Sequence, residues 1–170
     1  MNVGGHRLTN AELRGCFTAM GFDQVATFRA SGNVIFTAAD EPPTALERRI
    51  EAELAGALGY AVPTFIRRAA DLRAIAARKP FAQAPLDRAA GKLQVALLAA
   101  PPSRAVRSSV LALASDEDRL EVGPRELYWL PRGGIMDSAL DMKVLEQLLG
   151  PMTMRTMGTV ELIANRYFAA

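Results

Sequence analysis

The residues of this chain that could do chemistry lie in two small polar turns and at one arginine. The NVGG turn directly precedes an expected helix start, where free backbone amides and the helix dipole favour negative charge. The SGN turn at 31–33 would present amides and a hydroxyl in a concave bend. Arg155 carries the forked donors that bind phosphate or carboxylate in bidentate fashion. The pattern predicts an anion site formed by Asn2, Gly4, Gly5, Ser31, Gly32, Asn33 and Arg155.

A structural interpretation accounts for the same residues without any ligand. Glycines satisfy turn geometry, the Ser-Gly pair closes a hairpin, and Arg155 pairs with a surface acid. The NVGG turn also lacks the spacing of a P-loop. From the sequence alone both interpretations stay open.

The other reactive residue types in the chain are few. One histidine, His6, and one cysteine, Cys16, cannot supply the roughly four ligands of a zinc site. A lone cysteine forms no disulfide within the chain, which fits a reducing compartment. Cys16 falls on the apolar face of an expected helix, and His6 is expected to be an exposed turn residue with no nucleophile nearby. We therefore predict no cofactor and no metal.

Composition predicts a folded protein in the cytoplasm. Half of the 170 residues are apolar and 22% are charged, which argues against disorder. The net charge of +2 is spread along the chain, which argues against nucleic acid as a partner. No window approaches the roughly 20 apolar residues of a membrane span, and no apolar signal segment opens the chain. We predict no membrane partner, and the sequence does not indicate an oligomeric state.

The first half of the chain predicts two helices, a hairpin and a strand. Thr9 with Glu12 forms a capping box that opens a helix ending at Gly21, with one apolar face of Leu13, Cys16, Phe17 and Met20. Two β-prone runs, 25–28 and 34–37, flank a Gly/Asn turn and predict a hairpin. A second capping box, Thr44 with Glu47, opens a helix that stops at Gly59, and its expected buried face holds Leu46, Ile50, Leu54 and Leu58. The run VPTFI at 62–66 predicts a strand.

The second half repeats a related pattern after a junction. A short helix at 71–79 ends before the Pro-rich stretch 79–92, so we predict subdomains at 1–79 and 80–170. An apolar strand at 93–100, a helix at 103–114 and a hairpin at 118–130 follow, and in this hairpin one of Tyr128 and Trp129 is expected to enter the core and the other to face outward. Ser138, three residues before Asp141, predicts the cap of the next helix, and Thr153 that of the last.

The order of elements up to residue 66 is turn, helix, strand, strand, helix, strand. One strand placed before it completes the β-α-β-β-α-β order of a ferredoxin-like unit. We therefore predict an α+β fold with two ferredoxin-like subdomains, the first lacking its N-terminal strand. The simplest explanation is a true start upstream of Met1; a sheet that closes over the gap, or a partner chain that fills it, are the alternatives.

Several motifs resemble one bacterial family. The segments MNVGG and SGNVIF, at their spacing, resemble the N-terminal signature of the bacterial domain-of-unknown-function 1697 family, which opens with a hydrophobic strand ending in Arg-Gly. The segments LYWLPRGGIMDSALD and MTMRTMGTV are similar to its later motifs. The family has no assigned activity, so the resemblance implies a fold far more than a function.

The chain departs from the family pattern at polar and cationic positions. Asp137, Ser138 and Ala139 stand where the family has Arg-Ser-Lys, and Thr156 with Met157 replace its Asn-Trp pair. The leading hypothesis from sequence is a binding module for a small anionic ligand, a nucleotide or phosphate. The alternatives are an enzyme acting on a phosphorylated or carboxylated substrate, and a protein–protein module that uses an exposed sheet edge.

Overall fold

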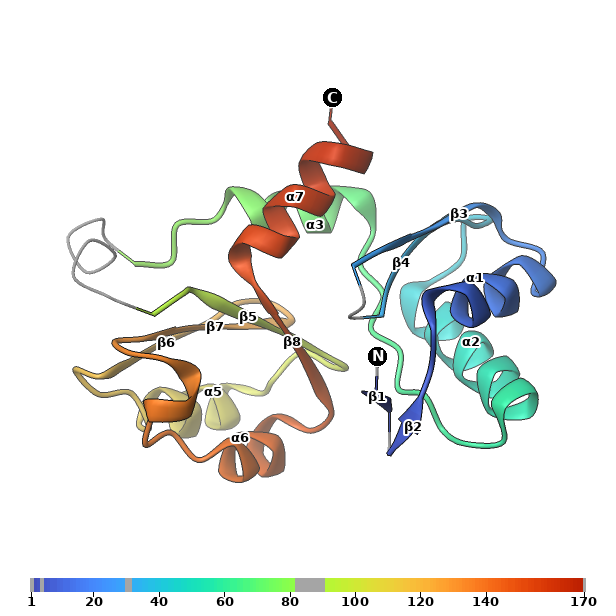
Figure 1. Cartoon of the computed structure of the whole chain (residues 1–170). Helices are drawn as coiled ribbons and strands as arrows, with labels where there is room; N and C mark the ends of the chain where they lie inside the picture. The colour runs from blue at the N-terminus through green and yellow to red at the C-terminus, as the bar shows by residue number, and fades with distance from the viewer. Residues whose placement is uncertain (1, 4, 30–31, 82–90, 170) are drawn as a thin grey trace. The chain divides into compact units, whose positions relative to one another are not determined.

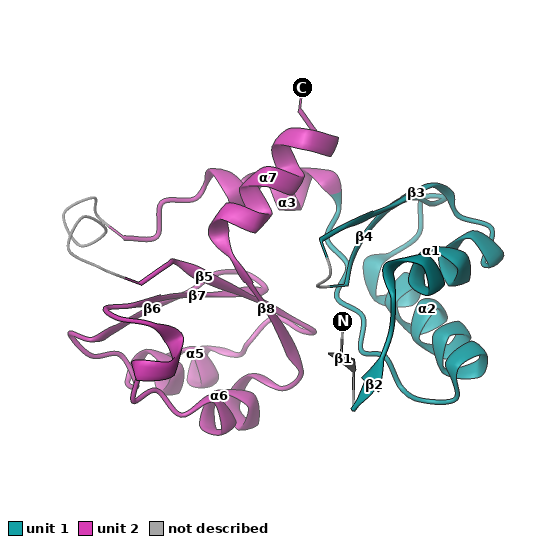
Figure 2. Ribbon diagram, in the orientation of Figure 1, with its two compact units in different colours: residues 1–68 teal, residues 69–170 magenta. Residues whose placement is uncertain are grey.

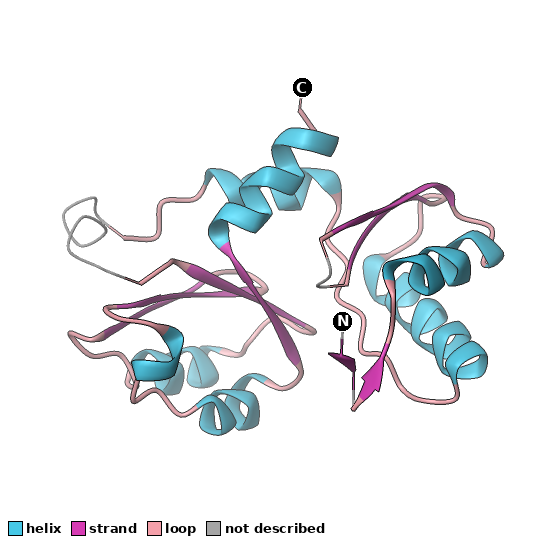
Figure 3. Cartoon of the chain, viewed as in Figure 1, coloured by secondary structure: helices cyan, strands magenta, loops and turns pink. Residues whose placement is uncertain are grey.

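The computed structural model (Figure 1) describes residues 2–3, 5–29, 32–81 and 91–169. It consists of two compact units, Met1–Arg68 and Ala69–Ala170, shown in Figure 2. Both units combine antiparallel sheets with helices (Figure 3), so the predicted α+β class is confirmed.

The described residues of unit 1 form two helices and two separate two-stranded sheets. Its elements are β1 (Asn2–Val3), β2 (His6–Arg7), α1 (Asn10–Ala19), β3 (Asp23–Phe28), β4 (Asn33–Thr37) and α2 (Pro43–Leu58). Among the described residues, β1 pairs only with β2 and β3 only with β4, in both cases antiparallel. The predicted hairpin is therefore confirmed.

The core of unit 1 forms where the predicted helix stripes meet the β3–β4 hairpin. Leu13 and Phe17 of α1 and Ile50 and Leu54 of α2 are at most 4% exposed. Phe36 of β4 packs edge-on against Phe17, with ring centroids 5.1 Å apart. The helical spacing read from the sequence thus selected the buried residues correctly.

Two capping predictions in unit 1 have different outcomes. The Thr9–Glu12 box is confirmed, with the Glu12 amide donating to Thr9 Oγ1 and the Thr9 amide donating to Glu12 Oε2. The Thr44–Glu47 box is wrong, because α2 is capped by Pro42 without a side-chain bond. Proline at the first helical position needs no partner for a missing N–H, which explains the earlier start at Pro43.

The predicted strand at 62–66 is also wrong, because these residues belong to no strand. The amide of Thr64 donates to Glu51 Oε1 at 2.8 Å, and that of Ile66 donates to Glu47 Oε1 at 2.7 Å. Both acceptors are side chains of α2. Glu47, which was expected to cap its own helix, therefore accepts a hydrogen bond from the Ile66 amide instead.

Unit 2 is built around a four-stranded antiparallel sheet in the order β6-β7-β5-β8. Its elements are α3 (Ala69–Ala77), β5 (Gln94–Leu98), α5 (Arg104–Leu111), β6 (Asp118–Val122), β7 (Glu126–Pro131), the 3-10 turn η1 (Ile135–Asp137), α6 (Met142–Leu149), β8 (Met152–Thr156) and α7 (Met157–Tyr167). From β5 to β8 the chain follows the β-α-β-β-α-β order. The sequence missed β8, which supplies the last strand of that order.

Helices cover both faces of this sheet, with α5 and α6 on one side and α3 and α7 on the other (Figure 1). All five residues of β5 are buried, which fits the almost unbroken apolar run at 93–100. Helix α3 packs against α7, so the compact units divide after Arg68, whereas composition placed the boundary after residue 79.

Two helix caps in unit 2 differ from the predictions. Asp141, rather than Ser138, caps α6, and its Oδ1 accepts a hydrogen bond from the Lys143 amide at 2.8 Å. Thr156, rather than Thr153, caps α7. In each case the residue closer to the helix takes the role, and the displaced hydroxyl finds another partner.

Candidate functional site

The residues predicted to form an anion site fall in both units. Asn2, Gly5, Gly32 and Asn33 belong to unit 1, and Arg155 belongs to unit 2. Gly4 and Ser31 lie outside the described residues. The geometry around each group is therefore considered within its own unit.

In unit 1 the glycines sit in hairpin turns that need them. Gly5, between β1 and β2, has a φ of +85°, and Gly32, before β4, has a φ of +71°. Only glycine adopts such left-handed angles without strain. Asn33 pairs with Phe28 across the hairpin, and its Nδ2 donates to the Phe28 carbonyl at 3.1 Å. Turn geometry alone thus explains these two glycines.

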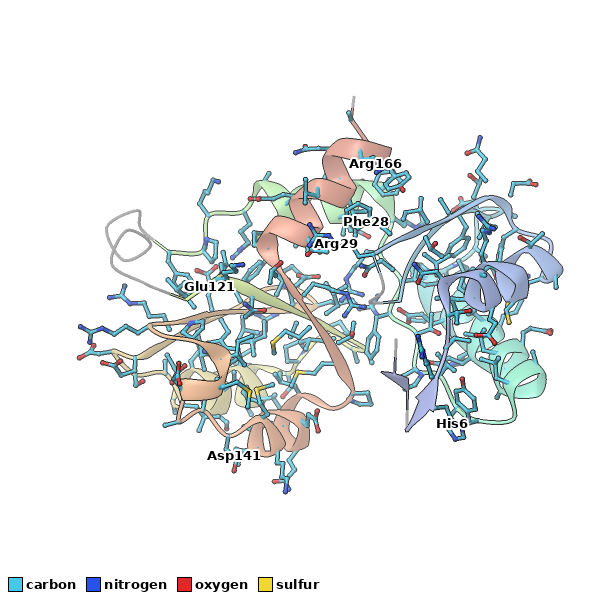
Figure 4. All side chains as sticks on the ribbon, in the orientation of Figure 1. His6, Phe28, Arg29, Glu121, Asp141 and Arg166 are labelled. Carbon is cyan, nitrogen blue, oxygen red and sulfur yellow. The ribbon has the colours of Figure 1, made fainter. Side chains whose placement is uncertain are left out.

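Strand β2 lies between the glycine turn and the start of α1. It pairs with β1, and Asn2 of β1 lies opposite Arg7 of β2. His6 of β2 is exposed and stacks on Tyr60, with ring centroids 4.1 Å apart and planes inclined by 7°. Figure 4 labels His6 on this strand. The prediction that the turn directly precedes the N-terminus of the helix is therefore wrong, because β2 lies between them.

The N-terminus of α1 already carries a negative group of its own. Hydrogen bonds from the Thr9 backbone and then from the Thr9 hydroxyl lower the pKa of Glu12 from its ordinary value. The carboxylate lies at the helix start, where the helix dipole favours negative charge. An outside anion at this position would meet Glu12.

Arg155 presents a different environment, on the β8 strand of unit 2. Its Nη1 donates to Thr153 Oγ1 at 2.8 Å and to the Met154 carbonyl at 2.7 Å. Burial lowers the pKa of the Arg155 guanidinium, but a guanidinium stays protonated in proteins. The site therefore holds a fixed positive charge partly withdrawn from water.

The register of the sheet shows what shares a face with Arg155. Arg155 pairs with Val95, Val95 pairs with Tyr128, and Tyr128 pairs with Glu121. Directly opposed residues lie on the same face of a sheet, so these four form one row across all four strands. We call this row the Arg155 row; it runs from a cation on β8 to a carboxylate on β6.

The carboxylate end of the Arg155 row is held by a second arginine. Arg78, which follows α3, donates from Nε to Glu121 Oε1 at 3.1 Å, and its guanidinium lies 5.4 Å from the Tyr128 ring centroid. The hydrogen bond to Glu121 raises the pKa of Arg78. Figure 4 labels Glu121 on β6. Sequence alternation places Glu121 and Tyr128 on one face of the hairpin, but only the pairing through β5 connects them to Arg155.

The opposite face of the sheet holds a buried polar cluster. Asp118 Oδ1 accepts hydrogen bonds from Trp129 Nε1 and from Ser138 Oγ, both at 2.7 Å. Trp129 and Tyr128 are each 1% exposed, so the prediction that one of them faces outward is wrong. The hydrogen bond from Ser138 to Asp118 of β6 connects the loop after β7 to the sheet. Ser138 therefore has a structural role.

Other site types are not found in the part of the chain that the structure describes. No three or more His, Cys, Asp or Glu residues gather there in a way that could hold a metal ion. None of the described helices combines the length and apolar character needed to cross a membrane.

Comparison with known proteins identifies the family. The structure of the conserved bacterial protein SP0830 from Streptococcus pneumoniae is similar, with a TM-score of 0.67 and 20% identity, over 97% of this chain and 92% of that chain. A likeness at this identity shows the fold alone. No curated protein matches the chain. The sequence model described as "Protein of unknown function (DUF1697)" matches residues 1–128, well over half of the chain, and the chain therefore belongs to the DUF1697 family.

Proposed function

We propose that this chain is a binding module for a small anionic ligand, such as a nucleotide or a phosphate, and that Arg155 supplies the charge. The observation that carries the proposal is the partly buried guanidinium of Arg155 on β8. Burial disfavours its charged form and lowers its pKa. A cation in a low-dielectric setting attracts an anion far more strongly than one in bulk water. An anion bound there would recover part of the lost solvation.

The neighbours of Arg155 support this role because they orient the guanidinium. The contacts of Nη1 with Thr153 and Met154 hold one terminal nitrogen against its own strand. A guanidinium fixed in this way loses less conformational entropy when it binds a ligand. The two glycine turns of unit 1 give the proposal no further support, because turn geometry already explains Gly5 and Gly32. The single cysteine favours a reducing compartment, so we place the protein in the cytoplasm.

A thermal-shift screen of the full chain against phosphate, nucleotides and carboxylates tests the proposal. A ligand at about 100 times its dissociation constant should add about 2.7 kcal/mol of stability. Arg155→Met should abolish the shift, and Arg155→Lys should keep only part of it, because lysine offers a point charge without the fork. Arg166→Met, at an exposed position on α7, is the matched control.

Two results would contradict the proposal. One is the absence of any shift across the whole panel with the unaltered chain. The other is a shift that Arg155→Met and Arg166→Met reduce equally, because it would show a general charge effect rather than a site at Arg155.

A further inference from the structure

Met136 is the most exposed of the large apolar side chains in the part of the chain that the structure describes. It lies in the η1 turn of unit 2 and is 94% exposed, while its neighbour Ile135 is 45% exposed. Single exposed apolar residues are common on protein surfaces. A methionine differs from the others because its thioether sulfur can be oxidised. At this position the sulfur meets water and the solutes that water carries.

The cores of the two units shield the other methionines. The chain has seven methionines, and all except Met1 lie among the described residues. Met157 is 5% exposed. Four more are partly buried and pack against the core of one unit or the other, namely Met20, Met142, Met152 and Met154. A packed sulfur is fully reached by a solute only when its surroundings open, so Met136 should react first in the folded chain.

The turn that carries Met136 is held in place by other residues. The Gly134 amide donates to Asp137 Oδ2 at 3.1 Å, and the Asp137 amide donates to the Gly134 carbonyl at 3.0 Å. Directly after the turn, Ser138 Oγ donates to Asp118 Oδ1 at 2.7 Å. None of these bonds uses the Met136 side chain, so a polar group on its sulfur leaves the turn and its connection to the sheet intact.

We infer that Met136 is a site of reversible oxidation, at which hydrogen peroxide converts the thioether to a sulfoxide in the folded protein. The sulfur lone pair attacks one peroxide oxygen, the O–O bond breaks and an S–O bond forms. The second oxygen leaves as water, so that sulfur is oxidised and peroxide is reduced. This change replaces an apolar tip with a polar one.

The exposed position also makes the sulfoxide accessible to repair. Methionine sulfoxide reductases return each sulfoxide epimer to the thioether. In that reaction a pair of thiols is oxidised to a disulfide, and the sulfoxide oxygen leaves as water. The oxidation site is independent of the anion site at Arg155.

Peptide mapping by mass spectrometry, after brief treatment of the full chain with dilute hydrogen peroxide, tests the inference. Met136 should gain one oxygen at least about tenfold faster than each of the other five described methionines. Met136→Leu should remove this fast reaction, whereas Met20→Leu, which changes a packed methionine, should leave it unchanged. Both substitutions nearly conserve side-chain volume. Methionine sulfoxide reductases of both epimer specificities, supplied with dithiothreitol, should restore the original mass.

The same time course in concentrated urea separates the fold from the local sequence. The six methionines should then react at similar rates, because no core shields any of them. A Met136 that stays fastest in urea would overturn the inference, since its selectivity would not come from exposure in the fold. Oxidation of a packed methionine as fast as Met136 in the folded chain, or a Met136 sulfoxide that the reductases leave unchanged, would also overturn it.

Discussion

The two units carry related patterns of elements but reach different sheets. In unit 2 the segment after α6, MTMRT, forms β8, while in unit 1 the corresponding segment after α2, VPTFI, forms no strand. VPTFI contains one proline but is otherwise made of valine, threonine, phenylalanine and isoleucine, which all favour strands. The difference lies in the partner: β8 pairs with β5 along its whole length. Strand formation here follows the available partner rather than local propensity.

The partner also decides where polar groups end up. In unit 2 the pairing of β5 with β8 places Arg155 in a row with Val95 and Tyr128. In unit 1 the amides of Thr64 and Ile66 take carboxylates from α2. A central apolar strand thus builds the candidate site in one unit, and side chains satisfy the backbone in the other.

The largest expected effects come from the cores of the two units. Leu98 of β5 and Ile50 of α2 are both fully buried, and truncation of either to alanine should cost about 2–5 kcal/mol. Leu98→Ala should speed amide exchange in both β7 and β8, because β5 joins them, whereas Ile50→Ala should act on unit 1. Urea unfolding and hydrogen exchange measure both. Leu111→Ala, at a 45% exposed position, should change stability by less than about 0.5 kcal/mol.

Gly91→Ala tests how tightly the chain enters the sheet of unit 2. A Cβ at Gly91 would lie 2.1 Å from the Pro131 carbonyl oxygen and 2.3 Å from that of Gly133. Backbone atoms cannot move aside as a flexible side chain can, so we expect a loss of about 1–3 kcal/mol in urea unfolding. Gly158→Ala in α7, where a Cβ meets nothing within 4 Å, should be neutral or stabilising. Equal effects of the two changes would contradict the close approach.

Glu47→Ala tests the substitution of carboxylates for a strand in unit 1. Loss of the acceptor leaves the Ile66 amide without its partner, which should cost about 1–3 kcal/mol. Glu47→Gln keeps an oxygen acceptor and should cost less. Thr44→Ala should change stability by less than about 0.5 kcal/mol, because Pro42 caps the helix. A larger loss of stability for Thr44→Ala than for Glu47→Ala in thermal unfolding would contradict this assignment and favour the capping role predicted for Thr44 from the sequence.

Local signals in the sequence predicted much of the fold. Helix stripes such as Leu13 with Phe17, and the reciprocal cap of Thr9 with Glu12, depend on residues three or four apart, and both are confirmed. The two wrong caps at Thr44 and Ser138 have the right spacing, but α2 begins one residue before Thr44, with Pro42 as its N-cap, and Asp141, which directly precedes α6, replaces Ser138. Spacing identifies the helix but not which of several candidates caps it.

The pairing of distant strands could not be predicted in this way. The strand β8 was missed because its segment MTMRT is short and has only two apolar residues, Met152 and Met154. It also lies between a Gly-Pro pair and a helix. Arg155 was singled out from its residue type, whereas its row with Tyr128 and Glu121 depends on register across β5. Register is set by burial and by distant partners, which a single sequence does not display.

The smallest expected effect distinguishes the helix starts of the two units by their response to pH. Hydrogen bonds from the Thr9 backbone and hydroxyl lower the pKa of Glu12 below its ordinary value in the folded chain. A carboxylate that protonates at lower pH when folded stabilises the fold fully above its ordinary pKa, and this contribution disappears as the pH falls through the lowered value. The difference in melting temperature between the unaltered chain and Glu12→Gln should therefore shrink on acidification.

In unit 2, α5 is capped by the Ser103 hydroxyl, with no acid in its first turn, so the effect of Ser103→Ala should not follow the titration of Glu12. A Glu12→Gln difference that stays constant with pH would show that the hydrogen bonds, rather than the charge, hold the start of α1.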